Sequence, residues 1–182
     1  MYINEIRLDK TILKTSNALR GVENRKAIYI EEISELVQAI LEYEENDKEK
    51  GAYNDKLLDH VAEELSDVII IANCTKMILD VPTRAISITI KNTDFNSSYT
   101  IVNNILLPAI KCFTKYIRDP KANICMLYKS LSYILCTVEK IANYYGIDAE
   151  RLNKWIEFKQ TREQSRLEDT YGNTITALYL SK

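Results

Sequence analysis

The chain has 182 residues with 24 basic and 26 acidic side chains, which gives a net charge of −2. This length suits one domain with a sizeable core, and the lack of a basic excess argues against nonspecific binding of nucleic acid. With four glycines and three prolines, the chain has too few turn residues for a β-sandwich or barrel. His60 is the single histidine, so His-rich metal sites are nearly excluded.

Hydrophobic periodicity predicts an all-α chain, with helices near residues 4–20, 24–45, 54–80, 100–118, 122–145 and 148–168. The expected helix ends and caps lie at Gly21, Asn24, Pro82, Asp119-Pro120, Gly146 and Asp148. Residues 83–99 fit least, because Ile86, Ile88 and Ile90 alternate as in a short strand. The final dozen residues are expected to fray. The predicted fold is a bundle of about five to six helices in a single domain over residues 1–182.

The two halves of this bundle share a pattern of side chains. Corresponding positions carry similar residues, namely Leu65/Leu131, Val68/Ile134, Ile33/Ile105 and Leu41/Phe113. The pattern favours an internally duplicated arrangement of helix pairs, in which residues 100–147 are a degenerate repeat of residues 25–81. The alternative is that residues 100–147 are simply further bundle helices, because amphipathic helices resemble one another by default.

Neither end of the chain nor its cysteines suggest export or membrane insertion. The N-terminus has no basic segment followed by an apolar one, and the longest apolar run, residues 68–72, is far shorter than the roughly 18 residues of a membrane span. The cysteines contain no CxxC pair, which predicts reduced, buried thiols in a cytoplasmic protein at Cys74, Cys112, Cys125 and Cys136.

Two predicted helices each carry an acid-x-x-acid pattern, formed by Glu32 and Glu35 and by Glu64 and Asp67. Residues three apart are neighbours on a helix surface, and each acidic pair lies beside the main apolar stripe of its helix. Apolar residues such as Ile28 and Ile71 share these acidic rows, which is unusual for a fully solvated face. We therefore expect the two helices to bring four carboxylates into a partly enclosed cleft.

Four carboxylates in one cleft require protons or bound cations. Ligands with oxygen atoms only suit hard cations such as Mg²⁺ or Mn²⁺, and Mg²⁺ typically bridges carboxylates to substrate phosphates. The pattern therefore points to metal-assisted hydrolysis of a phosphoanhydride. The alternative is an ordinary solvated helix face. A di-iron bundle is disfavoured because it requires Glu-x-x-His on two helices, and His60 stands alone.

The order Glu32-x-x-Glu35 followed by Glu64-x-x-Asp67 resembles the signature of the all-α NTP pyrophosphohydrolases, a superfamily that includes MazG-like enzymes and dimeric, all-α dUTPases. The resemblance covers about residues 25–81 and returns at residues 144–148, before a basic final helix. Residues 83–120 match no part of the family. The long insert favours an internally doubled arrangement similar to that of the dimeric dUTPases.

The resemblance implies Mg²⁺-dependent hydrolysis of a (deoxy)nucleoside triphosphate to the monophosphate and pyrophosphate, with Mn²⁺ as a substitute. It also implies four metal ligands, at Glu32, Glu35, Glu64 and Asp67. Glu35 is the candidate that orients or deprotonates the attacking water. A homodimer is expected, because helices with two apolar rows leave surface to bury.

The cationic partners of a triphosphate are expected on the basic final helix, residues 148–169, at Lys154, Lys159 and Arg162. The alternative is a solvated basic face near the end of the chain. Asn17 and Asn73 are candidate contacts to the nucleoside, with a structural role as the alternative for Asn73. The competing function is a catalytically silent helical module that binds a nucleotide or a partner protein. No nucleic acid or membrane partner is expected.

Overall fold

The computed structural model describes residues 5–46, 52–86, 95 and 97–180, and of these the side chains of residues 52, 53 and 173–180 are not described. All regular structure in this part is helical, which confirms the predicted all-α bundle. The main helices are α1 (Lys10–Asn46), α2 (Ala52–Ile78), α4 (Leu107–Arg118), α5 (Ile124–Leu135) and α7 (Ala149–Leu180). Shorter elements connect them, namely η2 (Thr83–Ala85), α3 (Ser98–Ile101), the π-helix η3 (Val102–Leu106) and α6 (Val138–Tyr144).

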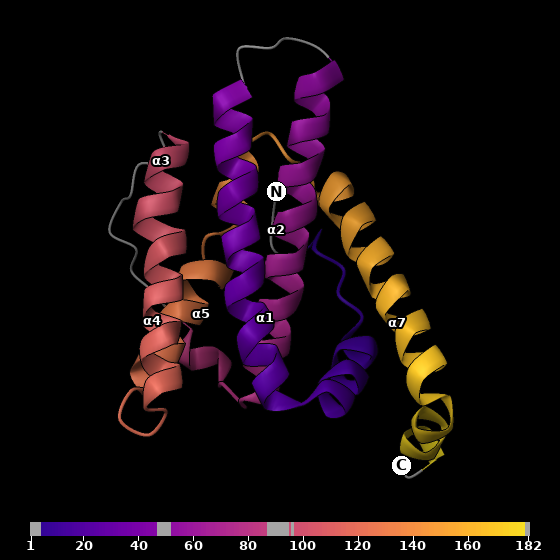
Figure 1. The fold of residues 1–182 in the computed structure, drawn as a ribbon. Helices are drawn as coiled ribbons and strands as arrows, with labels where there is room; N and C mark the ends of the chain where they lie inside the picture. The colour runs from indigo at the N-terminus through magenta and orange to yellow at the C-terminus, as the bar shows by residue number, and fades with distance from the viewer. Residues whose placement is uncertain (1–4, 47–51, 87–94, 96, 181–182) are drawn as a thin grey trace.

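A long hairpin of α1 and α2 forms the centre of the molecule (Figure 1). The pair α4 and α5 lies on one side of this hairpin, and α7 leans across the other side (Figure 1). Tyr29 of α1 and Phe113 of α4 are fully buried between the two helix pairs, with ring centroids 4.2 Å apart. The hairpin therefore has its core against α4 and α5 and turns another face toward α7. No helix in the described part is long and apolar enough to cross a bilayer.

Helix α1 consists of two segments that meet at Gly21. The glycine has φ of 77°, a left-handed conformation that side chains with a Cβ rarely adopt. A Cβ placed there would meet nothing within 4 Å, so the dihedral angle and not crowding requires the glycine. The predicted helix end at Gly21 is confirmed. The first segment, residues 10–20, turns toward α7, as the indigo ribbon shows (Figure 1).

The turn between α6 and α7 follows its local sequence signals. Gly146 ends α6 with φ of 67°, and the N–H of Ile147 donates to the carbonyl of Ala142 at 2.9 Å. This is the hydrogen bond of a Schellman motif. The carboxylate of Asp148 then caps α7 by accepting a hydrogen bond from the N–H of Arg151 at 2.8 Å. The predicted helix end at Gly146 and the predicted helix cap at Asp148 are both confirmed.

The predicted helix over residues 122–145 is wrong in one respect, because it is interrupted between α5 and α6. Thr137 there has φ of −120°, and its hydroxyl donates to the carbonyls of Tyr133 and Ile134. A threonine hydroxyl that binds these carbonyls competes with the backbone N–H groups that would continue the helix. The sequence pattern of apolar residues runs through this break and does not reveal it.

Two other regions differ from the sequence prediction. The helical stretch that begins at Ser98 contains η3 directly before Leu107-Pro108. Since proline has no N–H and crowds the preceding turn, a wider π-turn accommodates it. At the other end of the chain, α7 continues to Leu180 with a kink at Tyr171, so the expected fraying of the final dozen residues is wrong as far as Leu180, and residues 181–182 lie outside the described part. The strand predicted around Ile86 falls mainly on residues 87–94, outside the described part.

Burial supports only part of the predicted internal repeat. Leu65 and Leu131 are both fully buried. In the other helix pair, Leu41 of α1 is 45% exposed whereas its counterpart Phe113 is fully buried. Ile33 and Ile105, aligned in the same helix pair, are both fully buried, so burial matches at some aligned positions and not at others. The duplication stays a prediction.

An N-terminal strap, residues 5–9, lies along α7 and is held by two side-chain amides. Asn153 accepts a hydrogen bond from the N–H of Arg7 and donates to the carbonyl of Glu5, both at 2.8 Å. Gln160 accepts from the N–H of Asp9 at 3.0 Å and donates to its carbonyl at 3.2 Å. Since these amides lie two helical turns apart on α7, they fix both ends of the strap.

Candidate functional site

Three carboxylates meet between the two arms of the central hairpin. Glu32 and Glu35 lie one turn apart on α1, and Glu64 lies on α2. One oxygen from each of the three side chains lies within 4.8 Å of the others. The oxygen donors suit a hard cation, and a spacing of up to 4.8 Å is close to the roughly 4.2 Å between opposite ligands of Mg²⁺. The structure thus brings together three of the four predicted acids around one point.

Asp67, the fourth predicted acid, adjoins this cluster but has a different partner. It accepts a hydrogen bond from the ammonium of Lys159 on α7. Lys159 is only 8% exposed and also contacts Glu63, with Nζ 2.8 Å from a carboxylate oxygen. The lysine that we predicted as a phosphate ligand therefore neutralises acids of α2 in this structure.

The crowding of these acids raises their pKa values. Burial raises the pKa of Glu32 to about 8, and the negative charges of Asp67, Glu35 and Glu64 act in the same direction. Burial also raises the pKa of Glu64, followed by the charge of Asp67. Without a cation, Glu32 therefore holds a proton at neutral pH. A metal ion and this proton would compete for the same carboxylate.

Glu64 provides a further indication that the cluster suits a cation. Its Oε2 atom is buried and has no hydrogen-bond partner in the described part of the chain. Its Oε1 atom lies 3.3 Å from Nε2 of His60, whose Nδ1 is 3.7 Å from Glu42. A buried carboxylate oxygen without a partner is costly, and coordination to a hard cation would satisfy it.

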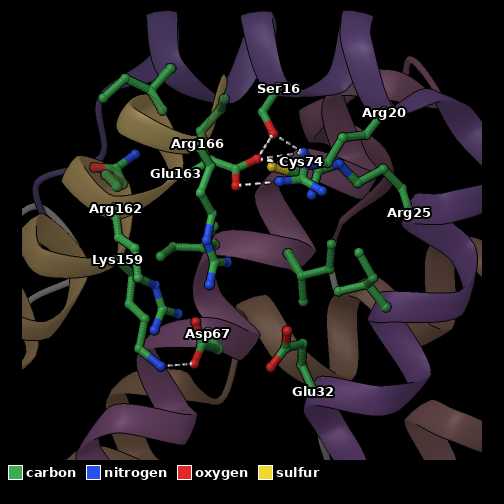
Figure 2. Close-up of a pocket in the computed structure, with 16 residues that line it drawn as sticks. Ser16, Arg20, Arg25, Glu32, Asp67, Cys74, Lys159, Arg162, Glu163 and Arg166 are labelled. Atoms are coloured by element: carbon green, nitrogen blue, oxygen red, sulfur yellow. Dashed lines mark hydrogen bonds and ion pairs between the residues drawn. The ribbon is translucent and has the colours of Figure 1, made fainter. Parts of the chain in front are cut away.

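A cavity of about 170 Å³ begins beside the acids and extends toward the first segment of α1 (Figure 2). Glu32 and Asp67 line one end of the cavity, and isoleucine and leucine side chains line part of its wall. The remaining lining contains Glu163 and three neutral residues together with five cations, namely Arg20, Arg25, Lys159, Arg162 and Arg166. Carboxylates and cations therefore share one enclosed space, as binding of a metal with a phosphate would require.

Arg20 and Glu163 close the far end of this cavity (Figure 2). Arg20 donates from Nε and Nη2 to the two oxygens of Glu163, each at 2.7 Å. Ser16 also donates to Glu163 and accepts a hydrogen bond from Arg25. These contacts join the first segment of α1 to α7, and they depend on the turn at Gly21.

Of the three predicted phosphate ligands, the structure places two beside the acids. Lys159 and Arg162 line the cavity. Lys154 is exposed and lines a different cavity, between the N-terminal strap and α7. Five residues separate Lys154 from Lys159, which places the two side chains about 140° apart around the helix. The structure therefore does not bring Lys154 to the acidic cluster.

Neither predicted nucleoside contact lines this cavity. Asn17 is buried, and its amide donates to the carbonyl of Cys74 at 2.9 Å. Asn73 donates to the carbonyl of Ile69, in its own helix, at 2.8 Å. Each lies beside a separate cavity. The contact made by Asn73 matches the structural role considered as its alternative.

Sequence reasoning did not identify Arg20, Arg25 and Glu163 as site residues. The available signal was local: Ser16 and Arg20 lie one turn apart, as do Arg162 and Arg166. These two rows meet because of the way α7 crosses α1, and no local sequence pattern predicts that crossing.

The four cysteines form no disulfide, and Cys74 is buried as predicted. Cys112 and Cys136 are half-buried, and Cys125 is exposed in the first turn of α5, so the prediction of buried thiols is wrong at these three positions.

Comparison of the chain with protein-family models, with curated proteins and with solved structures finds no match. The resemblance to the all-α NTP pyrophosphohydrolases therefore rests on the acidic motifs of the sequence alone.

Proposed function

We propose that the chain hydrolyses a (deoxy)nucleoside triphosphate to the monophosphate and pyrophosphate, with Mg²⁺ bound by its acidic cluster. One observation carries the proposal: Glu32, a member of the three-carboxylate cluster, lines one end of a cavity together with Asp67, and five cationic side chains line the same cavity. A carboxylate cluster alone is common on protein surfaces. A cluster joined to an arginine-lined cavity suits a ligand that contains both a metal ion and phosphates.

Each acid has a role in this proposal. Glu32, Glu35 and Glu64 would hold the cation through their oxygen atoms, and Asp67 would join them once Lys159 releases it. The bound ion would neutralise phosphate charge and lower the pKa of a water molecule. Glu35, an exposed member of the cluster, is placed to accept a proton from the attacking water.

Lys159 has a second role in the same proposal. Its ammonium is held by Asp67 and Glu63 on α2. When Asp67 turns to the cation, Lys159 becomes available to the substrate phosphates, beside Arg162. The ion pair thus keeps the lysine in place before substrate arrives and limits repulsion among the acids.

The test is release of pyrophosphate from each of the eight common NTPs and dNTPs with Mg²⁺, and with Mn²⁺ as substitute. Glu35→Gln and Asp67→Asn should lower turnover by about 100-fold or more, as expected for loss of a catalytic carboxylate. Glu31→Gln is the matched control, because Glu31 is exposed on the same helix and does not belong to the cluster. Unchanged turnover in both cluster variants would refute the site.

A homodimer is the proposed assembly, and sedimentation at several protein concentrations tests it.

The competing function is a catalytically silent module that binds a nucleotide or a protein partner. The pairing of Lys159 with Glu63 and Asp67 favours this alternative, because the lysine neutralises acidic charge on α2 without a metal ion. Absence of pyrophosphate release from all substrates, with retained nucleotide binding, would support the silent module.

A further inference from the structure

The end of the cavity away from the acids contains a buried guanidinium that the protein leaves partly unpaired. The side chain of Arg25 is 8% exposed. Its Nη2 donates to Ser16, but its Nε is buried without a hydrogen-bond partner among the described residues. Burial is the main cause that lowers the pKa of Arg25. A buried cation without full compensation is costly, so this position suits a bound anion.

The carboxylate of Glu163 provides only part of that compensation. It lies 3.9 Å from Nη2 of Arg25, while both of its oxygens accept hydrogen bonds from Arg20 at 2.7 Å. One carboxylate thus serves two guanidinium groups, and Arg20 has the better geometry. Arg25 therefore shares its carboxylate partner with Arg20 and is only partly compensated.

Arg162 and Arg166 add two more cations to the same space. They lie one turn apart on α7, are exposed, and make no hydrogen bond or ion pair within the part of the chain that the structure describes. The guanidinium of Arg162 lies over the ring of Phe158, 5.7 Å from its centroid. Figure 2 shows both guanidinium groups extending into the cavity between Glu163 and Asp67. Lys159, in contrast, is engaged by Asp67 and Glu63. The chain as a whole has a net charge of −2, so a cavity lined by Arg162 and Arg166 without a carboxylate partner in the described chain, and by Arg25 with a shared one, carries a local excess of positive charge.

We propose that Arg25, Arg162 and Arg166 form a diphosphate site that works without metal. Guanidinium groups bind phosphate oxygens in pairs of parallel hydrogen bonds. A single phosphate brings at most about two negative charges at neutral pH, whereas a diphosphate comes closer to balancing three guanidinium groups. The inference rests on the proposed function in one respect: the diphosphate is the pyrophosphate half of the triphosphate, or the same group after release.

The test measures binding of inorganic pyrophosphate by calorimetry in EDTA, with orthophosphate and sulfate as comparisons. Loss of one charged hydrogen-bonding partner should weaken pyrophosphate binding by about tenfold or more, in Arg25→Met and in Arg166→Met. Arg118→Met is the matched control, because Arg118 is exposed at the end of α4 and does not line the cavity. The exposed Arg166 keeps the test informative if Arg25→Met fails to fold.

A second arm uses an α,β-methylene nucleoside triphosphate, which keeps its terminal diphosphate. Displacement of pyrophosphate by this analogue would support assignment of the site to the substrate, and simultaneous binding of both would overturn that assignment. Equal pyrophosphate affinity in the wild type and both arginine variants would overturn the site itself. Pyrophosphate binding in a protein that hydrolyses no triphosphate would support the site and refute the proposed function.

Discussion

Arg20 and Glu163 form a two-point ion pair, in which each oxygen of Glu163 accepts a hydrogen bond from Arg20 at 2.7 Å. Arg20 ends the first segment of α1, and Glu163 lies in the middle of α7. The pair therefore sets the distance between the two walls at the far end of the cavity. Both side chains keep some contact with solvent, so its strength lies between that of a surface pair and that of a buried one.

We expect a coupling free energy of about 1 kcal/mol between Arg20 and Glu163. The coupling free energy is obtained from the urea unfolding of four proteins: the wild type, Arg20→Met, Glu163→Gln and the double variant. The coupling should decrease in high salt, because part of it is electrostatic. A coupling near zero at low salt would mean that the two walls are held by other contacts.

Glu32 predicts an unusual dependence of stability on pH. Folded Glu32 holds its proton up to about pH 8, whereas in the unfolded chain a glutamate loses it near pH 4–5. Between these values the unfolded state binds fewer protons than the folded state, so the free energy of unfolding falls as the pH rises. In EDTA, the wild type should therefore lose stability between about pH 5 and pH 8.

Glu32→Gln removes this penalty. At pH 8.5 it should raise the melting temperature by about 2–4 °C, equivalent to about 1 kcal/mol once solvent screening is allowed for. Glu31→Gln on the exposed side of α1 should leave the pH profile unchanged. Mg²⁺ should stabilise the wild type most at high pH, where protons no longer compete for the carboxylates. A wild-type profile that rises with pH in EDTA would contradict the raised pKa.

The two amide contacts of the N-terminal strap predict separable effects on hydrogen exchange. Asn153→Ala should increase exchange at the N–H of Arg7, and Gln160→Ala should increase it at the N–H of Asp9, because each amide is protected by one side chain. Each variant should cost about 1 kcal/mol, the usual value of a hydrogen bond. The two variants control for each other. Equal exchange at both positions in both variants would show that the strap is held by other contacts.

Gly21→Ala tests whether the turn within α1 depends on the left-handed conformation. The substitution should destabilise the protein by about 1–2 kcal/mol, since an alanine with φ of 77° is strained. Gly172→Ala is the matched control, because its backbone angle is not positive and its surroundings are also open. Urea unfolding of both variants gives the comparison. Equal stability would contradict the role assigned to Gly21.

Local signals account for the parts of the fold that were predicted correctly. Gly21, Gly146 and Asp148 act within a single turn of chain, so their effect is visible in the sequence. The meeting of Glu32, Glu35 and Glu64 was also predictable, because helical spacing places the acids in one row of each helix and a hairpin brings the rows together.

The remaining site residues depend on contacts across the chain. Arg20 and Glu163 are separated by 143 positions, and Lys159 and Asp67 by 92. Periodicity identifies the face of a helix but not the helix that will cover it. For the same reason the sequence left Arg25 unassigned, since its burial follows from the crossing of α1 and α7. The break at Thr137 arose from a competition between a hydroxyl and the backbone, which hydrophobic patterning does not record.

The N-terminal strap, residues 5–9, contacts α7, so the strap can be held in place only after α7 has been synthesised. The cavity likewise receives the cations of α7 only at that stage. The acidic hairpin consists of neighbouring segments, whereas the strap bonds to Gln160 over a separation of 151 positions. During synthesis the acids therefore assemble well before any cation of α7 has left the ribosome. Until α7 arrives, protons or metal ions from solution must balance the charge of the hairpin. A chain that ends before residue 149 would keep the carboxylates and lose Lys159, Arg162 and Arg166, the cations that oppose them.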